Sequence, residues 1–311
     1  MKTAFLYAGQ GSQHKGMGKD LYDEFEEFRE VFDSAELDFD LKKVCFEDPD
    51  EQISITKYTQ PCMVAFATGV TAILNKKGIR PDIMAGLSLG EYSALSAAGV
   101  WDAKQTISLV AFRGEAMTRS AEGVDAAMNA IIGMDRETLQ ECVDEAAGSG
   151  VVSICNDNCP GQIVIGGEKA AVDEAARIAK EKGAKRCMPL NVSGPFHTKF
   201  MDRAADELRE KFKETEFGKE TIPVVFNYIG RERNENETIQ ELLEAQVKNG
   251  VMMTSTLKYM LDKGVRRFVE IGPGKALTGF VKKTAKAMGI EDVVFFNVET
   301  VEDINNLVEN W

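Results

Sequence analysis

Runs of apolar residues of strand length recur along the chain, separated by longer segments in which apolar residues return every three or four positions. Four of these runs lie at residues 3–9, 81–86, 266–272 and 292–298. Strands that alternate with helices in this way are typical of a parallel sheet covered by helices. The pattern therefore predicts an α/β fold.

The pattern changes between residues 124 and 192, where apolar runs and helical segments follow one another in the order βαββαβ. Pro160 and Gly161 provide the turn between the two middle strands. This order is that of a ferredoxin-like unit. We therefore predict a ferredoxin-like small domain at 124–192, inserted into a larger catalytic body made of residues 1–123 and 193–311.

Composition and charge narrow the function. The chain has 311 residues, 44% of them hydrophobic, and a formal net charge of −13, which disfavours nucleic acid as a partner. Its six cysteines form no CxxC pair, which fits a reducing cytoplasm. Cys155 and Cys159 have no histidine nearby, so we expect no metal site. No signal peptide and no membrane span of roughly 18 apolar residues is expected.

Ser88 is the first candidate for catalysis, because it lies in the string Gly-Leu-Ser-Leu-Gly at residues 86–90. The string follows a predicted strand and opens a predicted helix, which is the setting of a nucleophile elbow. Gly86 and Gly90 allow the turn to approach neighbouring backbone closely. The same string also fits a serine that merely caps a helix, so Ser88 needs a partner to be assigned as a nucleophile.

The choice of a base for Ser88 is narrow, because the chain has only two histidines, His14 and His197. His197 comes after Ser88 in the chain, as in hydrolases of the α/β type. Ser193 or Gly194 could cap a helix there, and His197 would then lie in its first turn. A helix N-terminus disfavours the imidazolium, so we expect a neutral His197 that accepts the serine proton.

Seven segments together resemble the malonyl-CoA:acyl carrier protein transacylases of fatty acid synthesis, a family related to the acyltransferase domains of polyketide synthases. The resemblance covers essentially the whole chain. It rests on GQGSQ (9–13), GLSLGEYSAL (86–95), RGEAM (113–117), NCPGQIVIGG (158–167), SGPFH (193–197), EAQV (244–247) and EIGPG (270–274).

The resemblance implies an α/β-hydrolase-like body and an enzyme that needs no cofactor. Ser88, activated by His197, would take malonyl from malonyl-CoA and pass it to the phosphopantetheine thiol of acyl carrier protein. The remaining family roles concern binding and positioning. The resemblance places the backbone amides of Gln10 and Leu89 in the oxyanion hole, Arg113 on the malonyl carboxylate, Phe196 against the malonyl C2 carbon and Gln246 in the segment that holds His197.

Arg113 also suits that task on chemical grounds, since a guanidinium matches a carboxylate with two hydrogen bonds. Leu87 departs from the family, which commonly has histidine beside the serine, and this leaves the polarity of the pocket open. Three alternatives stay open here. The chain could be a discrete acyltransferase of a polyketide synthase, a serine hydrolase or thioesterase with the same Ser–His pair, or a non-catalytic module that binds carrier protein.

Overall fold

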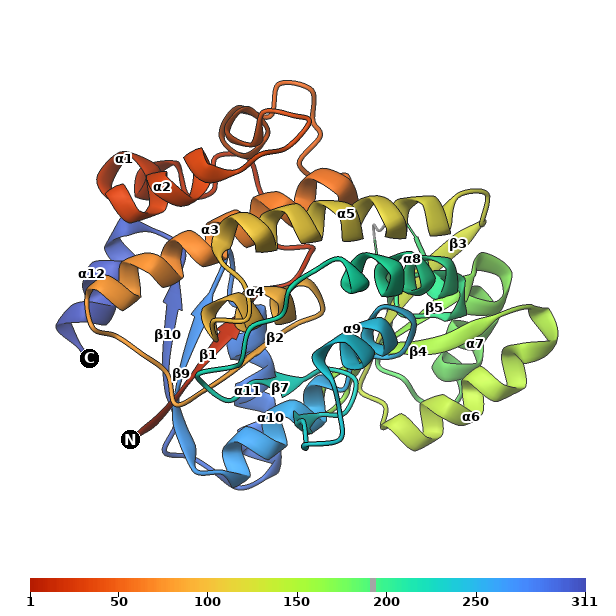
Figure 1. The fold of residues 1–311 in the computed structure, drawn as a ribbon. Coiled ribbons are helices and arrows are strands. Elements are labelled where there is room, and N and C mark those ends of the chain that lie inside the picture. Colours follow the sequence, from red (N-terminus) through yellow and green to blue (C-terminus); the bar gives the residue numbers. More distant parts are fainter. Residues whose placement is uncertain (191–193) are drawn as a thin grey trace.

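The computed structural model describes residues 1–190 and 194–311, and within them the predicted parallel sheet is confirmed. This sheet has four strands in the order β10-β9-β1-β2, all parallel (Figure 1). The strands are β1 (Lys2–Tyr7), β2 (Ile83–Gly86), β9 (Val265–Ile271) and β10 (Val294–Val298). Because they are parallel, the loops that follow β1, β2 and β9 start at the same edge, which is where open α/β sheets bind ligands.

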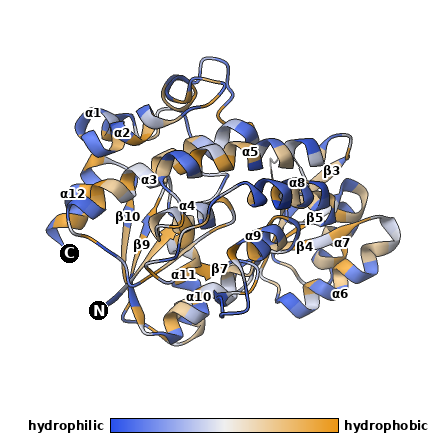
Figure 2. Ribbon diagram, in the orientation of Figure 1, coloured by the Kyte–Doolittle hydropathy of each residue, from blue (hydrophilic) through white to orange (hydrophobic). Residues whose placement is uncertain are grey.

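Helices cover both faces of the parallel sheet, so successive residues of β1 enter different cores. Phe5 and Tyr7 pack in one core, and Ala4 and Leu6 pack in the other. The first core is shared by α2 (Glu26–Ser34), α3 (Thr56–Lys76), α4 (Leu89–Ala97) and α5 (Ala103–Ala121). The second is shared by α10 (Met253–Asp262) and α11 (Ala276–Ala287). Figure 2 shows the apolar residues concentrated around α4 and the strands, with mixed faces on the outer helices.

The remaining elements of the large unit lie around this frame. The helices are α1 (Lys19–Glu24), α8 (Asp202–Lys213), α9 (Ile239–Lys248) and α12 (Val301–Glu309), with a π-helix at Lys43–Glu47 and a 3₁₀ turn at Lys199–Met201. A two-stranded antiparallel ribbon consists of β7 (Val225–Phe226) and β8 (Arg231–Glu232).

A second, antiparallel sheet with strand order β4-β5-β3-β6 lies to the right in Figure 1. Its elements follow the predicted βαββαβ order: β3 (Ala126–Ile132), α6 (Arg136–Ala146), β4 (Val152–Cys159), β5 (Gln162–Glu168), α7 (Lys169–Glu181) and β6 (Arg186–Pro189), with a 3₁₀ turn at Ala147–Ser149. Both helices share one apolar cluster with the sheet. The predicted boundary at 192/193 falls outside the described residues, and the domain bounds stay a prediction.

The outer strand of the small sheet is joined to the large unit by backbone hydrogen bonds. The N–H of Asp157 donates to the carbonyl of Val251 (2.9 Å), and the N–H of Val251 donates to the carbonyl of Cys155 (2.8 Å). A β carbon on Gly250 would lie 2.7 Å from the carbonyl oxygen of Ile154, so the two segments touch through their main chains. The small sheet is thus connected along β4 to residues 250–251 of the large unit.

The helix predicted to begin beside His197 is not there. His197 lies in a turn with φ +61°, and the 3₁₀ turn begins two residues later, capped by Thr198, whose hydroxyl accepts from the N–H of Phe200 (3.3 Å). The left-handed backbone of His197 cannot continue a right-handed helix, which is why the helix starts downstream. Gly194 lies in a bend, and Ser193 is outside the described residues.

Candidate active site

Ser88 lies in a tight connection between the end of β2 and the start of α4, with φ +52° and ψ −100°. This backbone is sparsely populated for a residue with a side chain. The flanking glycines make the connection possible, because a β carbon on Gly86 would lie 1.9 Å from the carbonyl carbon of Gly90, and one on Gly90 would lie 2.1 Å from the carbonyl oxygen of Tyr7. The sequence motif therefore folds into a strained strand-to-helix turn that presents Ser88.

His197 contacts Ser88 directly, with 2.7 Å between Nε2 and the serine Oγ. Nδ1 lies 2.8 Å from the carbonyl oxygen of Gln246. A carbonyl can only accept, so Nδ1 carries the proton and Nε2 is free to accept the proton of the serine hydroxyl. The pair therefore has the geometry of a nucleophile and its general base, oriented by a backbone carbonyl rather than by a carboxylate.

The neutral state expected for His197 has a different cause from the one that the sequence indicated. The ring is buried, and burial together with the nearby Arg113 cation lowers its pKa to about 4. A helix terminus plays no part, because no helix begins at this residue. The imidazole is thus ready to accept a proton at neutral pH.

Arg113 is the third component of the site and projects from α5 with only 1% of its surface exposed. Its guanidinium donates to the side-chain oxygens of Gln60 (3.0 Å) and Gln246 (3.1 Å) and to the Ser88 Oγ (3.2 Å), and it lies over the ring of Tyr92. All of these acceptors are neutral. Among the described residues no carboxylate forms an ion pair with Arg113 within 4.0 Å. The buried carboxyl of Glu91 interacts with this cation only over a longer distance.

A cavity of about 560 Å³ opens over the Ser–His pair between the two sheets. Ser88, His197 and Arg113 line it together with Gln10, Leu89, Phe196 and Leu87, and the small unit adds Met128, Asn156, Asn158 and Val164. The backbone N–H groups of Gln10 and Leu89 have no acceptor within the described part of the chain. They are therefore available to a bound oxyanion.

Of the seven predicted site residues, six line this cavity, and Gln246 contacts it from behind through Ser88, His197 and Arg113. The side chain of Gln10 donates to Thr56 (3.1 Å), and Phe196 is almost fully buried. His14 lies elsewhere, half exposed and paired with Glu299 (2.7 Å). The binding roles assigned to these residues stay predictions.

Sequence reasoning missed three buried residues in this network: Gln60, Glu91 and Asn227. Glu91 directly follows the Gly-Leu-Ser-Leu-Gly string and belongs to the longer segment 86–95, but nothing in that pattern assigns a task to its carboxyl group. Asn227 follows a short apolar run, and Gln60 lies in a long helix. Neither has a spacing relation to Ser88, so only the folded chain brings them to it.

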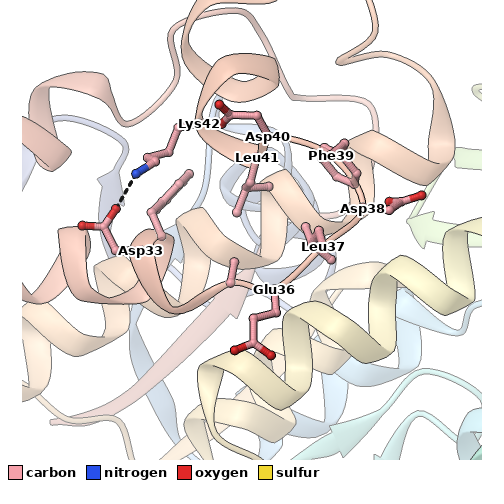
Figure 3. A pocket seen from close by; sticks show the side chains of 10 residues that line it. Asp33, Glu36, Leu37, Asp38, Phe39, Asp40, Leu41 and Lys42 are labelled. Carbon is pink, nitrogen blue, oxygen red and sulfur yellow. Dashed lines mark hydrogen bonds and ion pairs between the residues drawn. The ribbon is translucent and has the colours of Figure 1, made fainter.

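A further hollow, of about 640 Å³, is separate from this site. It is formed by the loop between α2 and the π-helix, and Figure 3 shows Lys42 reaching toward Asp33 there (2.7 Å). None of the predicted site residues line it. No cluster of metal-ligating side chains is found in residues 1–190 and 194–311.

Known proteins resemble this chain over its whole length. Residues 4–303 match the model of the acyl transferase domain family. The malonyl CoA-acyl carrier protein transacylase of Bacillus subtilis is 40% identical over 304 residues, 97% of this chain and 95% of the relative. The solved structure of the enzyme of the same name from Clostridium perfringens is 38% identical, with a TM-score of 0.94 over 100% of this chain and 97% of its own.

A second solved structure contains a type II polyketide synthase acyl-carrier protein in complex with its malonyl-transacylase. The matching chain is 38% identical, with a TM-score of 0.94 and full coverage of both chains. None of the helices in residues 1–190 and 194–311 has an apolar stretch of the length that spans a bilayer. The extent of these matches shows that the chain belongs to the acyl transferase domain family.

Proposed function

We propose that this protein transfers the malonyl group from malonyl-CoA to the phosphopantetheine thiol of an acyl carrier protein through a malonyl ester of Ser88. Relatives named malonyl CoA-acyl carrier protein transacylase match nearly the whole chain. The contact between Ser88 and His197 provides a nucleophile and its general base. We further propose fatty acid synthesis as the pathway and the cytoplasm as the compartment. All six cysteines are free, which fits a reducing environment.

In the first half-reaction, the Ser88 Oγ attacks the thioester carbonyl carbon while Nε2 of His197 takes the hydroxyl proton. The negative charge that develops on the carbonyl oxygen is stabilised by the N–H groups of Gln10 and Leu89. Collapse of this intermediate breaks the carbon–sulfur bond. His197 returns its proton to the departing thiolate, which leaves as free coenzyme A, and malonyl remains on Ser88.

In the second half-reaction, His197 takes the proton of the carrier-protein thiol, and the sulfur attacks the malonyl ester. The same amides stabilise the oxyanion, and the ester carbon–oxygen bond breaks. Ser88 regains its proton from His197. The products are malonyl-carrier protein and the unmodified enzyme, so atoms and charge balance over the cycle.

The observation that carries the malonyl assignment is the buried charge of Arg113, which faces Ser88 and contacts no carboxylate among the described residues. Taking a guanidinium out of water without an anion is unfavourable, and the free carboxylate of malonyl supplies that anion. Acetyl has no such group. A hydrolase of simple esters would gain nothing from this cation, so Arg113 favours a malonyl transferase over a general thioesterase.

Intact-mass measurement after incubation with malonyl-CoA tests the proposal. We expect the wild-type chain to gain one malonyl group, to keep it in buffer and to lose it to holo acyl carrier protein. Ser88→Ala should gain none. Release of free malonate without carrier protein would identify a hydrolase, and absence of any adduct would identify a non-catalytic binding module.

Replacement of the cation tests the acyl specificity separately. Arg113→Ala should lower kcat/KM for malonyl-CoA by roughly 30- to 4000-fold, equivalent to about 2–5 kcal/mol, because a charged pair loses one member, while acetyl-CoA loses little. The matched control is Arg119→Ala on the same helix, since Arg119 is paired with Glu207 (2.5 Å) outside the cavity. An unchanged ratio of malonyl to acetyl in Arg113→Ala contradicts the proposal.

A further inference from the structure

Asn227 is completely buried beside the turn that carries Ser88, directly after β7. Its side-chain oxygen accepts from the backbone N–H of Ser88 (2.6 Å), and its side-chain nitrogen donates to the carbonyl of Gly86 (2.7 Å). The orientation of the amide is fixed, because the serine N–H can only donate and the glycine carbonyl can only accept. One side chain therefore holds both ends of the strained turn.

These two bonds hold a residue whose backbone conformation is unfavourable. Ser88 is one of four residues other than glycine with positive φ in the described chain; the others are Asp48, Glu51 and His197. Such a conformation persists only where the surroundings determine it. The turn has its own hydrogen bond from the N–H of Gly90 to the carbonyl of Leu87 (3.0 Å). Asn227 adds two bonds to it and so favours the φ and ψ at which the Oγ reaches His197.

Asn227 also determines which backbone N–H group is free to donate to the oxyanion. Because the N–H of Ser88 is already bonded to Asn227, it does not point freely into the cavity. The next amide along the chain, that of Leu89, is left without an acceptor among the described residues. The same interaction thus fixes the nucleophile and leaves the Leu89 amide available.

Glu91 holds Asn227 in turn. Its Oε2 accepts from the backbone N–H of Asn227 (2.5 Å), and it lies in the first turn of α4, three residues after Ser88. The carboxyl is fully buried, and burial raises its pKa to about 8. Two hydrogen bonds therefore link Ser88 to Asn227 and Asn227 to Glu91, and the main chain from 88 to 91 closes the ring.

We propose that Asn227 is a positioning residue for the nucleophile and that Glu91 orients Asn227 through its main chain. Neither residue needs to touch the substrate. The proposal rests on the proposed function only in taking Ser88 as the nucleophile. It predicts an effect on the rate of acylation and none on recognition of the malonyl carboxylate, since the hydrogen bonds of Arg113 do not include Asn227.

The test compares Asn227→Ala and Asn227→Asp with Asn297→Ala. Asn227→Asp keeps the shape and the acceptor for Ser88 but loses the donor to Gly86, so it reports on the site even where the alanine variant folds poorly. Asn297 is a matched control, because its amide also bridges two groups, Glu270 (3.0 Å) and Thr278 (2.8 Å), far along the chain from Ser88.

Two rates are measured for each folded variant: malonylation of Ser88 in a single turnover, and labelling of Ser88 by a fluorophosphonate. We expect both rates to fall about 10- to 100-fold in the Asn227 variants, because a misplaced nucleophile lowers the rate by such factors. KM for malonyl-CoA should change less than about twofold, and Asn297→Ala should keep both rates within about twofold of wild type.

Glu91 is tested by Glu91→Gln and Glu91→Leu. Glutamine keeps an acceptor for the N–H of Asn227 and should retain most of the labelling rate, whereas leucine removes it and should resemble Asn227→Ala. Thermal unfolding that shifts while both Ser88 rates stay within twofold of wild type would overturn the proposal. A wild-type chain that reacts with the fluorophosphonate but not with malonyl-CoA would refute the proposed function alone, and the labelling comparison would still test Asn227.

Discussion

At the scale of single residues, the proton of His197 controls whether Ser88 can react. Burial and the Arg113 cation lower the pKa of this ring to about 4, so imidazolium forms only in acid. We expect the single-turnover rate of malonylation to be flat from about pH 5.5 to 7.5 and to fall below that range with an apparent pKa near 4, because the charged ring accepts no proton. A pH profile measured by quenched flow checks this.

A second variant separates the two causes of the low pKa. Arg113→Met removes the cation but leaves the ring buried, so with acetyl-CoA as donor the apparent pKa should move upward toward the ordinary value of 6.5. A wild-type profile that already breaks near 6.5 would mean that the ring is not buried as described.

At the scale of elements, the connection from β2 to α4 depends on the absence of a β carbon at Gly90. Gly90→Ala places that carbon 2.1 Å from the Tyr7 carbonyl, which no rotation of a side chain relieves. We expect a loss of about 3 kcal/mol or more in the free energy of unfolding. Gly279→Ala is the control, since Gly279 also lies in a helix but has open space around it, and it should gain about 0.5–1 kcal/mol. Urea unfolding that destabilises both alike would refute the steric argument.

Local chemistry explains how far the sequence could be interpreted at this scale. The strands that form β1, β2, β9 and β10 are marked by apolar runs, and the Ser88 turn is marked by glycines two residues away on each side. The turn at His197 escaped prediction because Pro195 and Gly194 favour a helix start, whereas the φ of the histidine is fixed by contacts with distant elements. The bridge made by Asn227 over 139 residues leaves no local pattern at all.

At the scale of the whole molecule, two buried groups give the stability opposite dependences on pH. The pKa of Glu91 is raised to about 8 in the folded chain, so between 4.5 and 8 the folded state holds the extra proton and stability falls as pH rises. The pKa of His197 is lowered to about 4, so between 4 and 6.5 the unfolded state holds the extra proton and stability rises with pH.

The effects of Glu91 and His197 on stability oppose each other up to pH 6.5. Above pH 6.5, the effect of Glu91 dominates. Stability should therefore fall by about 1 kcal/mol between pH 6.5 and 8. Glu91→Gln does not titrate and should flatten this interval relative to wild type in urea titrations at constant ionic strength. A decline of equal size in both proteins would assign it to other groups.

The backbone pairing of Cys155 and Asp157 with Val251 sets the boundaries at which this enzyme can be recombined with its relatives. The N–H of Met252, next along the chain, donates to the carbonyl of Asn227 (2.8 Å). Main-chain contacts therefore continue from β4 to Asn227, whose side chain accepts from the N–H of Ser88. A chimaera that exchanges only residues 124–192 separates these contacts, because β4 then comes from one parent and residues 250–252 from the other. Chimaeras that also exchange the segment from Val225 to Met252 take both contacting segments from one parent. In a recombination library, these chimaeras should retain acylation activity more often.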